Sequence, residues 1–299
     1  MKVKSTYWEL LLKLKSVYST VNTDSQSIII TEELEIIISE LFILPTDGLL
    51  IIRFNSKITN NKDFFEIAYS DSIRKNVKKI FELYLPYIIV NKNAEVPFSF
   101  VHIAQTIDGK IATASGKSKW IGNQENLVHA HRIRALVDAI LVGANTFKLD
   151  KPRLDVRHVK GDNPIKIIIA NSKLDLDCLS IGETILFSNN EIEYQSLPEN
   201  TEAICIEQDG NTIITTDLLK VLKQKGIHSL LIEGGSQTIR KFIEDKSIDR
   251  IEFHIAPMIF GSGKSGIELS AIDNLEEGIH LQNPITFKMG NALMLVSNL

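Results

Sequence analysis

The sequence contains only two cysteines, Cys178 and Cys205, and they are too far apart to form a CxxC pair. Such sparse cysteine usage argues against a disulfide framework and against a cysteine-rich structural zinc site. We therefore expect two free thiols in a reducing compartment, and the motifs of the sequence predict no metal.

Long hydrophobic runs are absent as well. No apolar run reaches the ~20 residues that a membrane-spanning helix needs. Residues 1–16 carry several lysines and lack the apolar core and small-residue cleavage site of a secretory signal. The net charge of −4 gives no attraction for nucleic acid or for an anionic membrane surface. We expect a cytoplasmic protein whose partner is a small molecule.

Two signatures of phosphate binding are also missing. No GxGxxG follows the first strand expected in the C-terminal part of the chain, so the dinucleotide-binding fold built on that fingerprint is not indicated. The GxxxxGK[ST] loop of ATPases is absent too.

The composition that remains is that of an ordinary globular protein, with 44% hydrophobic and 23% charged residues in a chain of 299 residues. This length suits one or two domains. In an N-terminal segment, residues 1–95, hydrophobic spacing predicts helices over residues 32–42 and 72–85 and a strand over residues 49–54. Residues 90–97 are polar, end in proline and are interpreted as a linker. This segment has no histidine and no paired carboxylates, so its role stays unknown.

From residue 98 to residue 299 apolar strands alternate with helices. The spacing predicts strands over residues 98–104, 137–142, 165–170, 184–187, 203–206, 229–232, 250–255, 286–289 and 292–296, and helices over residues 123–136, 217–225 and 236–244. The Gly290-Asn291 pair suits a tight hairpin between the last two strands. This pattern predicts an α/β fold with a mostly parallel sheet and antiparallel C-terminal strands.

Ligands of such sheets bind outside the carboxyl ends of the strands. We therefore expect the ligand to bind at the loops that follow Ala104, Gly143, Ala170 and Ile232. After Ile232 comes a Gly-Gly pair at a strand-to-helix junction, where backbone amides can approach a phosphate. By itself a Gly-Gly pair is as well explained by a tight turn.

A few polar and aromatic side chains stand out in or near these loops. Arg134, Arg157 and Ser118 could form an anion clamp, or the arginines could be surface ion-pair residues. Trp120 could stack on a cofactor ring or fill the core. Glu233 closes an apolar strand and could be a rim charge, or a carboxylate directed into a cleft toward a hydrogen-bonding substrate.

The motifs of residues 98–299 resemble the reductase domain of the riboflavin-pathway pyrimidine deaminase/reductase family. The matching segments, in order, are Ile107-Asp108-Gly109-Lys110, Ser118-x-Trp120-Ile121, Arg132-x-Arg134-Ala135-x-x-Asp138 continuing to Gly143-x-x-Thr146, Asp150-x-Pro152-x-Leu154-x-x-Arg157, Glu233-Gly234-Gly235 and Ala256-Pro257-x-x-x-Gly261. The resemblance covers about two-thirds of the chain and implies a dihydrofolate-reductase-like fold.

The resemblance also implies an activity. Members of the family transfer a hydride from NADPH to the ribosyl C1′ of a phosphoribosylaminopyrimidine, of the 5-amino-6-(5-phosphoribosylamino)uracil type, and form a ribityl product. The positions that match substrate contacts are Ser118, Arg134, Leu154, Arg157 and Glu233. The positions that match cofactor contacts are Ala104, Trp120, Thr146, Asp150, Ser172, Gly234 and Gly235. Glu233 and Asp150 are the candidate catalytic residues, and a homodimer is expected.

The sequence departs from the family at several points. The zinc deaminase domain of the bifunctional members needs an HxE motif and a cysteine pair, and the N-terminal segment has neither histidine nor cysteine. We expect no deaminase activity and interpret this segment as a packing or dimerisation module. Within the reductase motifs, Gly122 replaces a threonine, Gln105 precedes Thr106, and Asn171 replaces an aspartate.

These departures leave three alternatives open. The chain could reduce another pyrimidine or a pterin in a different pathway, or it could be a catalytically idle relative that binds a nucleotide-like ligand. A folate reductase shares the fold, but the arginines expected to bind the substrate phosphate argue against it.

Overall fold

The computed structural model describes residues 3–40, 43–119, 121–170, 174–176, 182–188, 197–206, 208–209 and 212–299. The chain forms two compact units, Lys2–Phe98 and Ser99–Leu299. Within the described residues no helix has the length and apolar character needed to cross a membrane.

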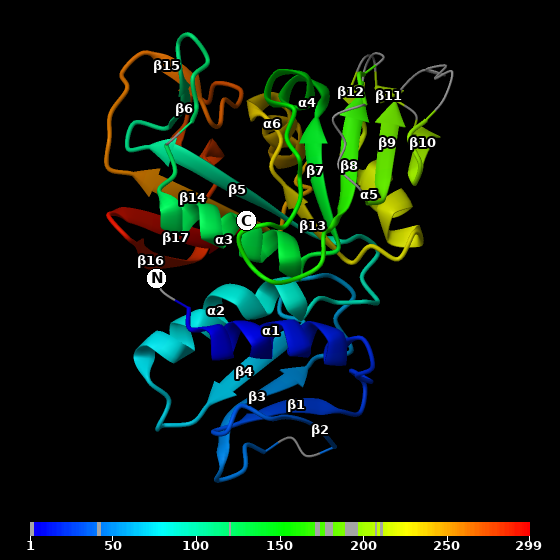
Figure 1. Ribbon diagram of the computed structural model, residues 1–299, viewed down its shortest axis with the longest axis vertical. Helices are drawn as coiled ribbons and strands as arrows, with labels where there is room; N and C mark the ends of the chain where they lie inside the picture. The colour runs from blue at the N-terminus through cyan, green and yellow to red at the C-terminus, as the bar shows by residue number, and fades with distance from the viewer. Residues whose placement is uncertain are drawn as a thin grey trace. The chain divides into compact units, whose positions relative to one another are not determined.

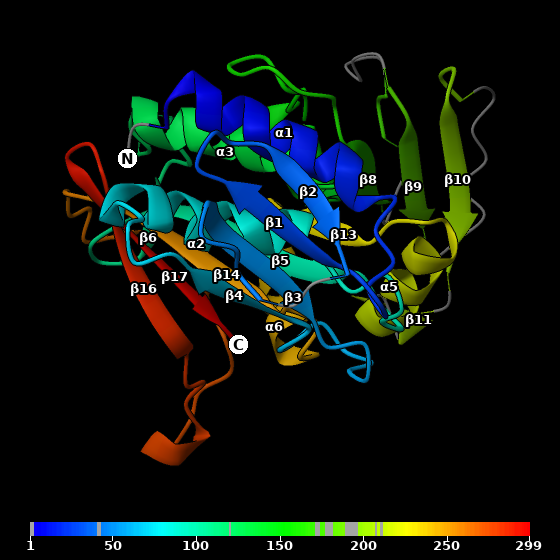
Figure 2. The ribbon, with the colours of Figure 1, turned by 90° about the horizontal axis from the view of Figure 1, so that it is seen from below.

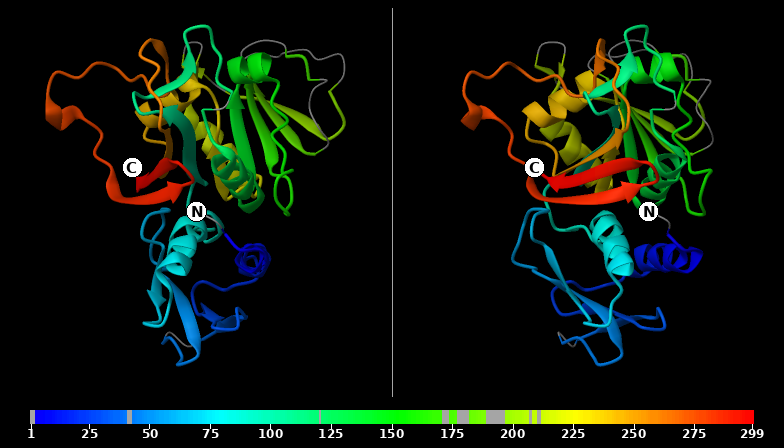
Figure 3. Two further views of the ribbon diagram at one scale, coloured as in Figure 1. Left: turned by 60° about the vertical axis from the view of Figure 1, so that its left-hand side comes forward. Right: turned by 90° about the vertical axis from the view of Figure 1, so that its left-hand side faces the viewer.

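The N-terminal unit is an antiparallel sheet with two helices. Strands β1 (Ser27–Thr31), β2 (Ile36–Ser39), β3 (Gly48–Phe54) and β4 (Phe65–Tyr69) pair in the order β2-β1-β3-β4. Helices α1 (Ser5–Tyr18) and α2 (Lys75–Ile88) lie on one face of the sheet (Figure 3). Their buried side chains, which include Leu11, Leu14, Phe81 and Tyr84, form the core with the isoleucines of β1.

The prediction of a helix over residues 32–42 is wrong where the structure describes it, up to residue 40. Leu34 takes a positive φ of 65°, and Ile36–Ser39 then form β2 alongside β1, with Ile36 opposite Ile30. The β-branched isoleucines have a high strand propensity, and a partner strand lies close by in sequence. These two factors prevail over the helical spacing of the apolar residues.

The helix expected over residues 72–85 is confirmed as α2 and the strand over residues 49–54 as β3. The stretch interpreted as a linker, residues 90–97, packs within the N-terminal unit. Asn91 is buried and donates hydrogen bonds from Nδ2 to the carbonyls of Ile58 and Asn60, each at 2.8 Å.

The C-terminal unit is built on one nine-stranded sheet (Figure 1). Its strands, in spatial order, are β10 (Thr201–Cys205), β9 (Thr184–Ser188), β8 (Ile165–Ala170), β7 (Ala139–Gly143), β13 (Ser229–Ile232), β5 (Phe98–Thr106), β14 (Arg250–Ala256), β17 (Ala292–Asn298) and β16 (Gln282–Met289). The run from β10 to β13 is parallel, and so is the pair β5 and β14. The antiparallel hairpin of β16 and β17 closes one edge (Figure 2).

Within the described residues, helices cover both faces of this sheet. Helix α3 (Gln124–Leu136) lies on one face, and α5 (Thr215–Gln224) and α6 (Ser236–Glu244) lie on the other (Figures 1 and 2). The short α4 (Ala144–Asp150) follows β7 directly. Smaller elements are the pair β6 (Lys110–Thr113) and β15 (Gly263–Ser265), the pair β11 (Gln208–Asp209) and β12 (Thr212–Ile213), and the 3-10 helix η1 (Leu275–Glu277).

The mostly parallel sheet with antiparallel C-terminal strands confirms the α/β architecture expected from the sequence. The central strands β7 and β13 are buried at every residue, because helices cover both faces of the sheet. Strand β8, strand β13 and helix α6 have the same bounds as the sequence predicted.

The burial of β13 leads to a stability prediction. Leu231→Ala removes a side chain that is 0% exposed and should lower the free energy of unfolding by about 2–5 kcal/mol. The control is Leu293→Ala in β17, where the side chain is 45% exposed and the loss should be about 0.5 kcal/mol or less. Urea unfolding of both variants measures the difference, and equal losses would contradict the central place of β13.

Candidate functional site

The ends of two neighbouring parallel strands form the centre of the candidate site. Strand β7 ends at Gly143, and α4 begins at the next residue. Strand β13 ends at Ile232, and Glu233 continues its pairing, because its backbone N–H donates to the Leu141 carbonyl at 3.0 Å. The loops after Gly143 and Ile232 are therefore adjacent at the carboxyl edge of the sheet.

Glycines allow these two loops to approach each other closely. A Cβ on Gly143 would lie 2.2 Å from Thr238 Oγ1, and a Cβ on Gly234 would lie 3.0 Å from the backbone nitrogen of Gly143. The Gly235 N–H donates to Thr146 Oγ1 at 2.7 Å. Close backbone packing thus accounts for the Gly-Gly pair, and it brings together Thr146 and Gly235, two residues that the sequence assigned to the same cofactor.

Arg134 and Glu233 form a bidentate ion pair. Arg134, in the last turn of α3, donates from Nε to Glu233 Oε1 at 2.9 Å and from Nη2 to Oε2 at 2.6 Å. The two side chains are only 13% and 16% exposed. Burial alone would raise the pKa of the Glu233 carboxyl, but the charge and hydrogen bonds of Arg134 hold that pKa below its ordinary value. Glu233 is therefore a carboxylate at neutral pH.

Asp155 joins the arginines of the site. Its Oδ1 accepts a hydrogen bond from Arg157 Nη1, its Oδ2 pairs with Arg153 Nη2 at 2.8 Å, and its backbone carbonyl accepts from Arg134 Nη1 at 3.2 Å. Burial by itself would raise the pKa of the Asp155 carboxyl. The hydrogen bond from Arg157 and the charges of the three arginines lower it by more, so the pKa lies below its ordinary value. Arg134 and Arg157 therefore lie near one another, and each is ion-paired with a carboxylate, so both the anion clamp and the ion-pair interpretation stay open.

Two histidines lie beside these arginines. The backbone N–H of Arg157 donates to His131 Nδ1 at 3.2 Å, and the His131 and His158 rings lie 4.6 Å apart between centroids. Burial, together with the charges of Arg134 and Arg157, lowers the pKa of His131 to about 4. A neutral imidazole can accept the Arg157 hydrogen bond, which an imidazolium could not do.

The remaining candidate residues are less connected to this region. Ser118 is exposed, and no hydrogen bond joins its side chain to either clamp arginine within the described residues. Asp150 is exposed at the end of α4, and Ala104 is half-buried in β5. Leu154 is buried with a positive φ of 53°. Trp120 and Ser172 lie outside the described residues.

The Asp108 motif joins two of the recognised segments. Asp108 accepts hydrogen bonds from the Thr106 hydroxyl at 2.5 Å, from the Gly261 N–H at 2.7 Å and from the Phe260 N–H at 3.2 Å. These bonds hold the turn after β5 against the loop after β14. The structure therefore gives Asp108 a clear role in building the loops.

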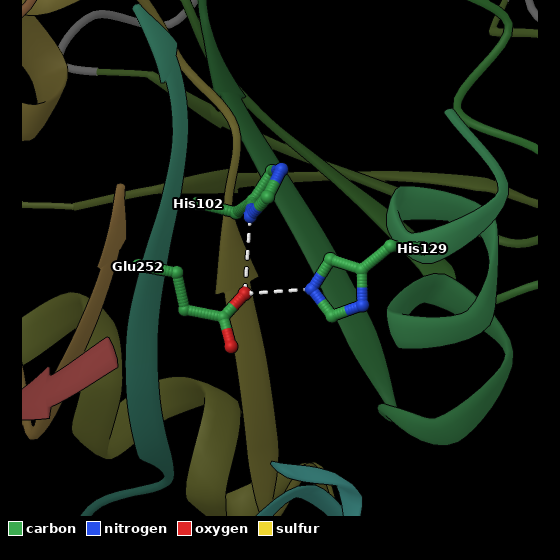
Figure 4. Close-up of side chains that lie close together, drawn as sticks. All are labelled: His102, His129 and Glu252. Carbon is green, nitrogen blue, oxygen red and sulfur yellow. Dashed lines mark hydrogen bonds and ion pairs between the residues drawn. The ribbon is translucent and has the colours of Figure 1, made fainter. Parts of the chain in front are cut away.

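A second polar cluster lies where α3 packs on the sheet (Figure 4). Glu252 Oε2 in β14 lies 3.0 Å from His102 Nδ1 in β5 and 3.0 Å from His129 Nε2 in α3. Glu252 and His129 are 0% exposed. Burial would raise the pKa of the Glu252 carboxyl, but the two imidazoles hold it well below its ordinary value.

Sequence reasoning found neither Asp155 nor the Glu252 cluster. Asp155 alternates with Arg153 and Arg157 in an extended loop, and that spacing was a usable signal for a shared carboxylate. No comparable signal marked the cluster, because β5 and β14 are brought together only by the sheet, which sets Glu252 opposite His102.

Comparison with known proteins gives the family. Residues 97–295 match the RibD C-terminal domain. The chain is 35% identical over 208 residues to the riboflavin biosynthesis protein RibD of Aquifex aeolicus, covering 67% of this chain and 57% of that protein. It is 29% identical over 209 residues to the 2,5-diamino-6-ribosylamino-4(3H)-pyrimidinone 5′-phosphate reductase of Methanothermobacter thermautotrophicus, covering 67% of this chain and 96% of that protein.

Solved structures agree. A deaminase/reductase from Thermotoga maritima has a TM-score of 0.59 at 25% identity, over 75% of this chain and 61% of that one. The riboflavin biosynthesis reductase Rib7 of Saccharomyces cerevisiae has a TM-score of 0.63 at 19% identity, over 75% of this chain and 99% of that one, and shows the shared fold. The α/β fold expected from the sequence is confirmed, and these reductases share it. Since the match spans well over half of the sequence, this chain belongs to the RibD C-terminal domain family.

Proposed function

We propose that this protein reduces the ribosyl group of a phosphoribosylaminopyrimidine to a ribityl group, with NADPH as the reductant, in riboflavin biosynthesis. The observation that carries the proposal is the grouping of Arg134, Arg157 and Glu233 at the carboxyl edge of β7 and β13. The relative from M. thermautotrophicus, of which the chain spans 96%, is named as a reductase of this kind.

The substrate phosphate is assigned to the arginines. Guanidinium groups bind phosphate oxygens through paired N–H donors, and the side chain of Arg157 is 41% exposed, so it can reach a ligand. Asp155 holds Arg157 close to Arg134 while that exposure is kept. In the proposal Ser118 and Leu154 complete the substrate contacts.

The glycine-lined junction is assigned to the cofactor. Side chains at Gly143, Gly234 and Gly235 would collide with neighbouring groups, so the backbone there is compact and close to any ligand above it. Thr146, Asp150, Gly234 and Gly235 would hold the cofactor on this side. The other proposed contacts are Ala104, Trp120 and Ser172. When bound, NADPH supplies the hydride.

The chain's own residues then position the substrate and hold its charges. Reduction breaks the C1′–O4′ bond of the ribosyl ring, adds a hydride at C1′ and leaves a hydroxyl at O4′ that must gain one proton. We assign Glu233 to hydrogen bonds with the polar groups of the substrate and to the placement of Arg134, since its carboxyl is ionised at neutral pH. Asp150 is assigned to the nicotinamide end of the cofactor.

We also propose that the protein is a cytoplasmic homodimer. The homodimer follows from the family resemblance, and the cytoplasmic location from the expectation of two free thiols in a reducing compartment. The N-terminal unit, which the family match does not include, is proposed as a packing or dimerisation module and not as a deaminase.

The direct test is an assay of the full chain with NADPH and 2,5-diamino-6-ribosylamino-4(3H)-pyrimidinone 5′-phosphate or its deaminated uracil counterpart. We expect loss of the reduced-cofactor absorbance and a product heavier by two hydrogen atoms. The unphosphorylated riboside should react poorly, because it lacks the anion that the arginines bind, and NADH and dihydrofolate serve as alternative reactants. Cofactor binding without turnover of either pyrimidine would show an idle relative and overturn the proposal.

Glu233→Gln tests the carboxylate. Glutamine carries no charge and cannot accept both hydrogen bonds of Arg134, so kcat/KM for the pyrimidine should fall about 10- to 100-fold, mainly through KM. The matched control is Glu202→Gln, which removes an exposed ion pair with Lys225 and should leave kinetics unchanged. A fall in kcat at constant KM would reassign Glu233 to proton transfer, and full activity would remove it from the site.

Asp155→Asn tests the link between the arginines. We expect a raised KM for the phosphorylated substrate and about 1–2 kcal/mol lower stability at neutral pH. Because folding lowers the pKa of Asp155, its carboxylate stabilises the protein above the ordinary aspartate pKa, and this contribution is lost as pH falls through the lowered value.

The stability deficit of Asp155→Asn should therefore shrink in acid, as measured by urea unfolding at neutral and acidic pH. Glu66→Gln is the control, since it removes an exposed ion pair with Arg53 in a β-strand. A deficit that stays constant with pH would contradict the ionic role of Asp155.

A further inference from the structure

The cluster around Glu252 combines three groups that bind metal ions in proteins. Glu252 Oε2, His102 Nδ1 and His129 Nε2 all lie within 4.8 Å of one another, and each nitrogen is 3.0 Å from the shared oxygen. Figure 4 shows both imidazoles directed at this oxygen. The three residues come from β5, α3 and β14, which are far apart in sequence and are brought together only by the fold.

The spacing is close to that of a coordination site. Ligand atoms bound at ~2.0–2.2 Å to one tetrahedral zinc ion lie roughly 3.3–3.5 Å apart. The two nitrogen–oxygen distances of 3.0 Å are a few tenths of an ångström shorter. Small side-chain rotations would therefore open the cluster enough for an ion.

The outer contacts of His102 favour the same interpretation. Its Nε2 lies 2.9 Å from Asn126 Oδ1, so Nε2 carries the proton and donates it to that oxygen. In the neutral ring Nδ1 then has a lone pair, which faces the lone pairs of Glu252 Oε2. A cation has to lie between them, either a second proton or a metal ion. Metal-binding histidines characteristically donate their other N–H to an oxygen in this way.

The carboxylate of the cluster lies in a buried place. Glu252 is fully buried, and a cation bound beside it would be favourable there. His254 lies on the same side of β14 as Glu252, and neither of its ring nitrogens has a hydrogen-bond partner within the described residues.

We propose that His102, His129 and Glu252 bind one divalent transition-metal ion, with zinc the favoured metal and the fourth coordination position left to a further ligand. Imidazole and carboxylate ligands suit zinc and also cobalt, nickel and iron. The ion would fasten α3 to β5 and β14. Since α3 also carries Arg134, the metal would be a structural support beneath the proposed site, and its presence does not depend on the proposed reaction.

The experiment measures bound metal in the full chain without an affinity tag. Protein is produced with Zn²⁺ or Co²⁺ in the growth medium, dialysed, and analysed for metal by mass spectrometry. We expect about one ion per chain, visible absorption bands of four- or five-coordinate Co²⁺, and a higher Tm for the loaded protein than for protein refolded with a chelator.

Variants locate the ion. His129→Gln and Glu252→Gln should reduce bound metal at least tenfold, whereas His280→Gln, which changes an exposed histidine, should not. Asn126→Ala keeps all three ligands but removes the hydrogen-bond partner of His102, and it should weaken metal binding about 10- to 100-fold. This variant still tests the proposal if a ligand variant does not fold. Absence of stoichiometric metal, or a Co²⁺ spectrum unchanged in the ligand variants and Asn126→Ala, would overturn the proposal and identify the cluster as a proton-linked network.

Discussion

The bidentate ion pair between Arg134 and Glu233 is the interaction on which the arrangement of the site depends. Both side chains are largely buried, and removing either partner would leave the other charge without compensation in a poorly solvated place. The pair joins the end of α3 to the end of β13. It therefore fixes the helix on the sheet and at the same time places a cation and an anion at the carboxyl edge, where parallel sheets bind their ligands.

Helix α3 is held against the sheet by polar contacts at two levels. Near its C-terminus Arg134 pairs with Glu233, and further toward its N-terminus His129 and Asn126 meet Glu252 and His102. Polar contacts of this kind are directional, whereas apolar packing tolerates sliding of one element along another. These contacts fix the position of α3 on the sheet. They therefore also fix the position of Arg134, which α3 carries.

Local patterns made most of the C-terminal fold predictable, because its strands are apolar runs bounded by turn residues and its helices have clear spacing. The prediction of a helix over residues 32–42 was wrong because the isoleucines there pair with a neighbouring strand. Pairing between strands cannot be deduced from the spacing of apolar residues alone. Arg134, Arg157 and Glu233 were recognisable as members of motifs. Asp155 and Glu252 were not, because their importance comes from partners that other elements supply. The substrate and cofactor roles of all these site residues, with Ser118 and Asp150 among them, remain predictions.

The two polar clusters also act on each other electrostatically. Burial and the pairing with Arg134 dominate the pKa of the Glu233 carboxyl, and a positive charge on His102 or His131 would lower that pKa further, so the Glu252 cluster is coupled to the site. A cation at Glu252, whether proton or metal, would extend the same effect and favour ionised Glu233. Burying charged groups costs folding free energy. Here the buried charged groups lie around α3, the helix that carries Arg134. The clusters therefore form one electrostatic unit, in which support of the helix and the ionisation of Glu233 are coupled.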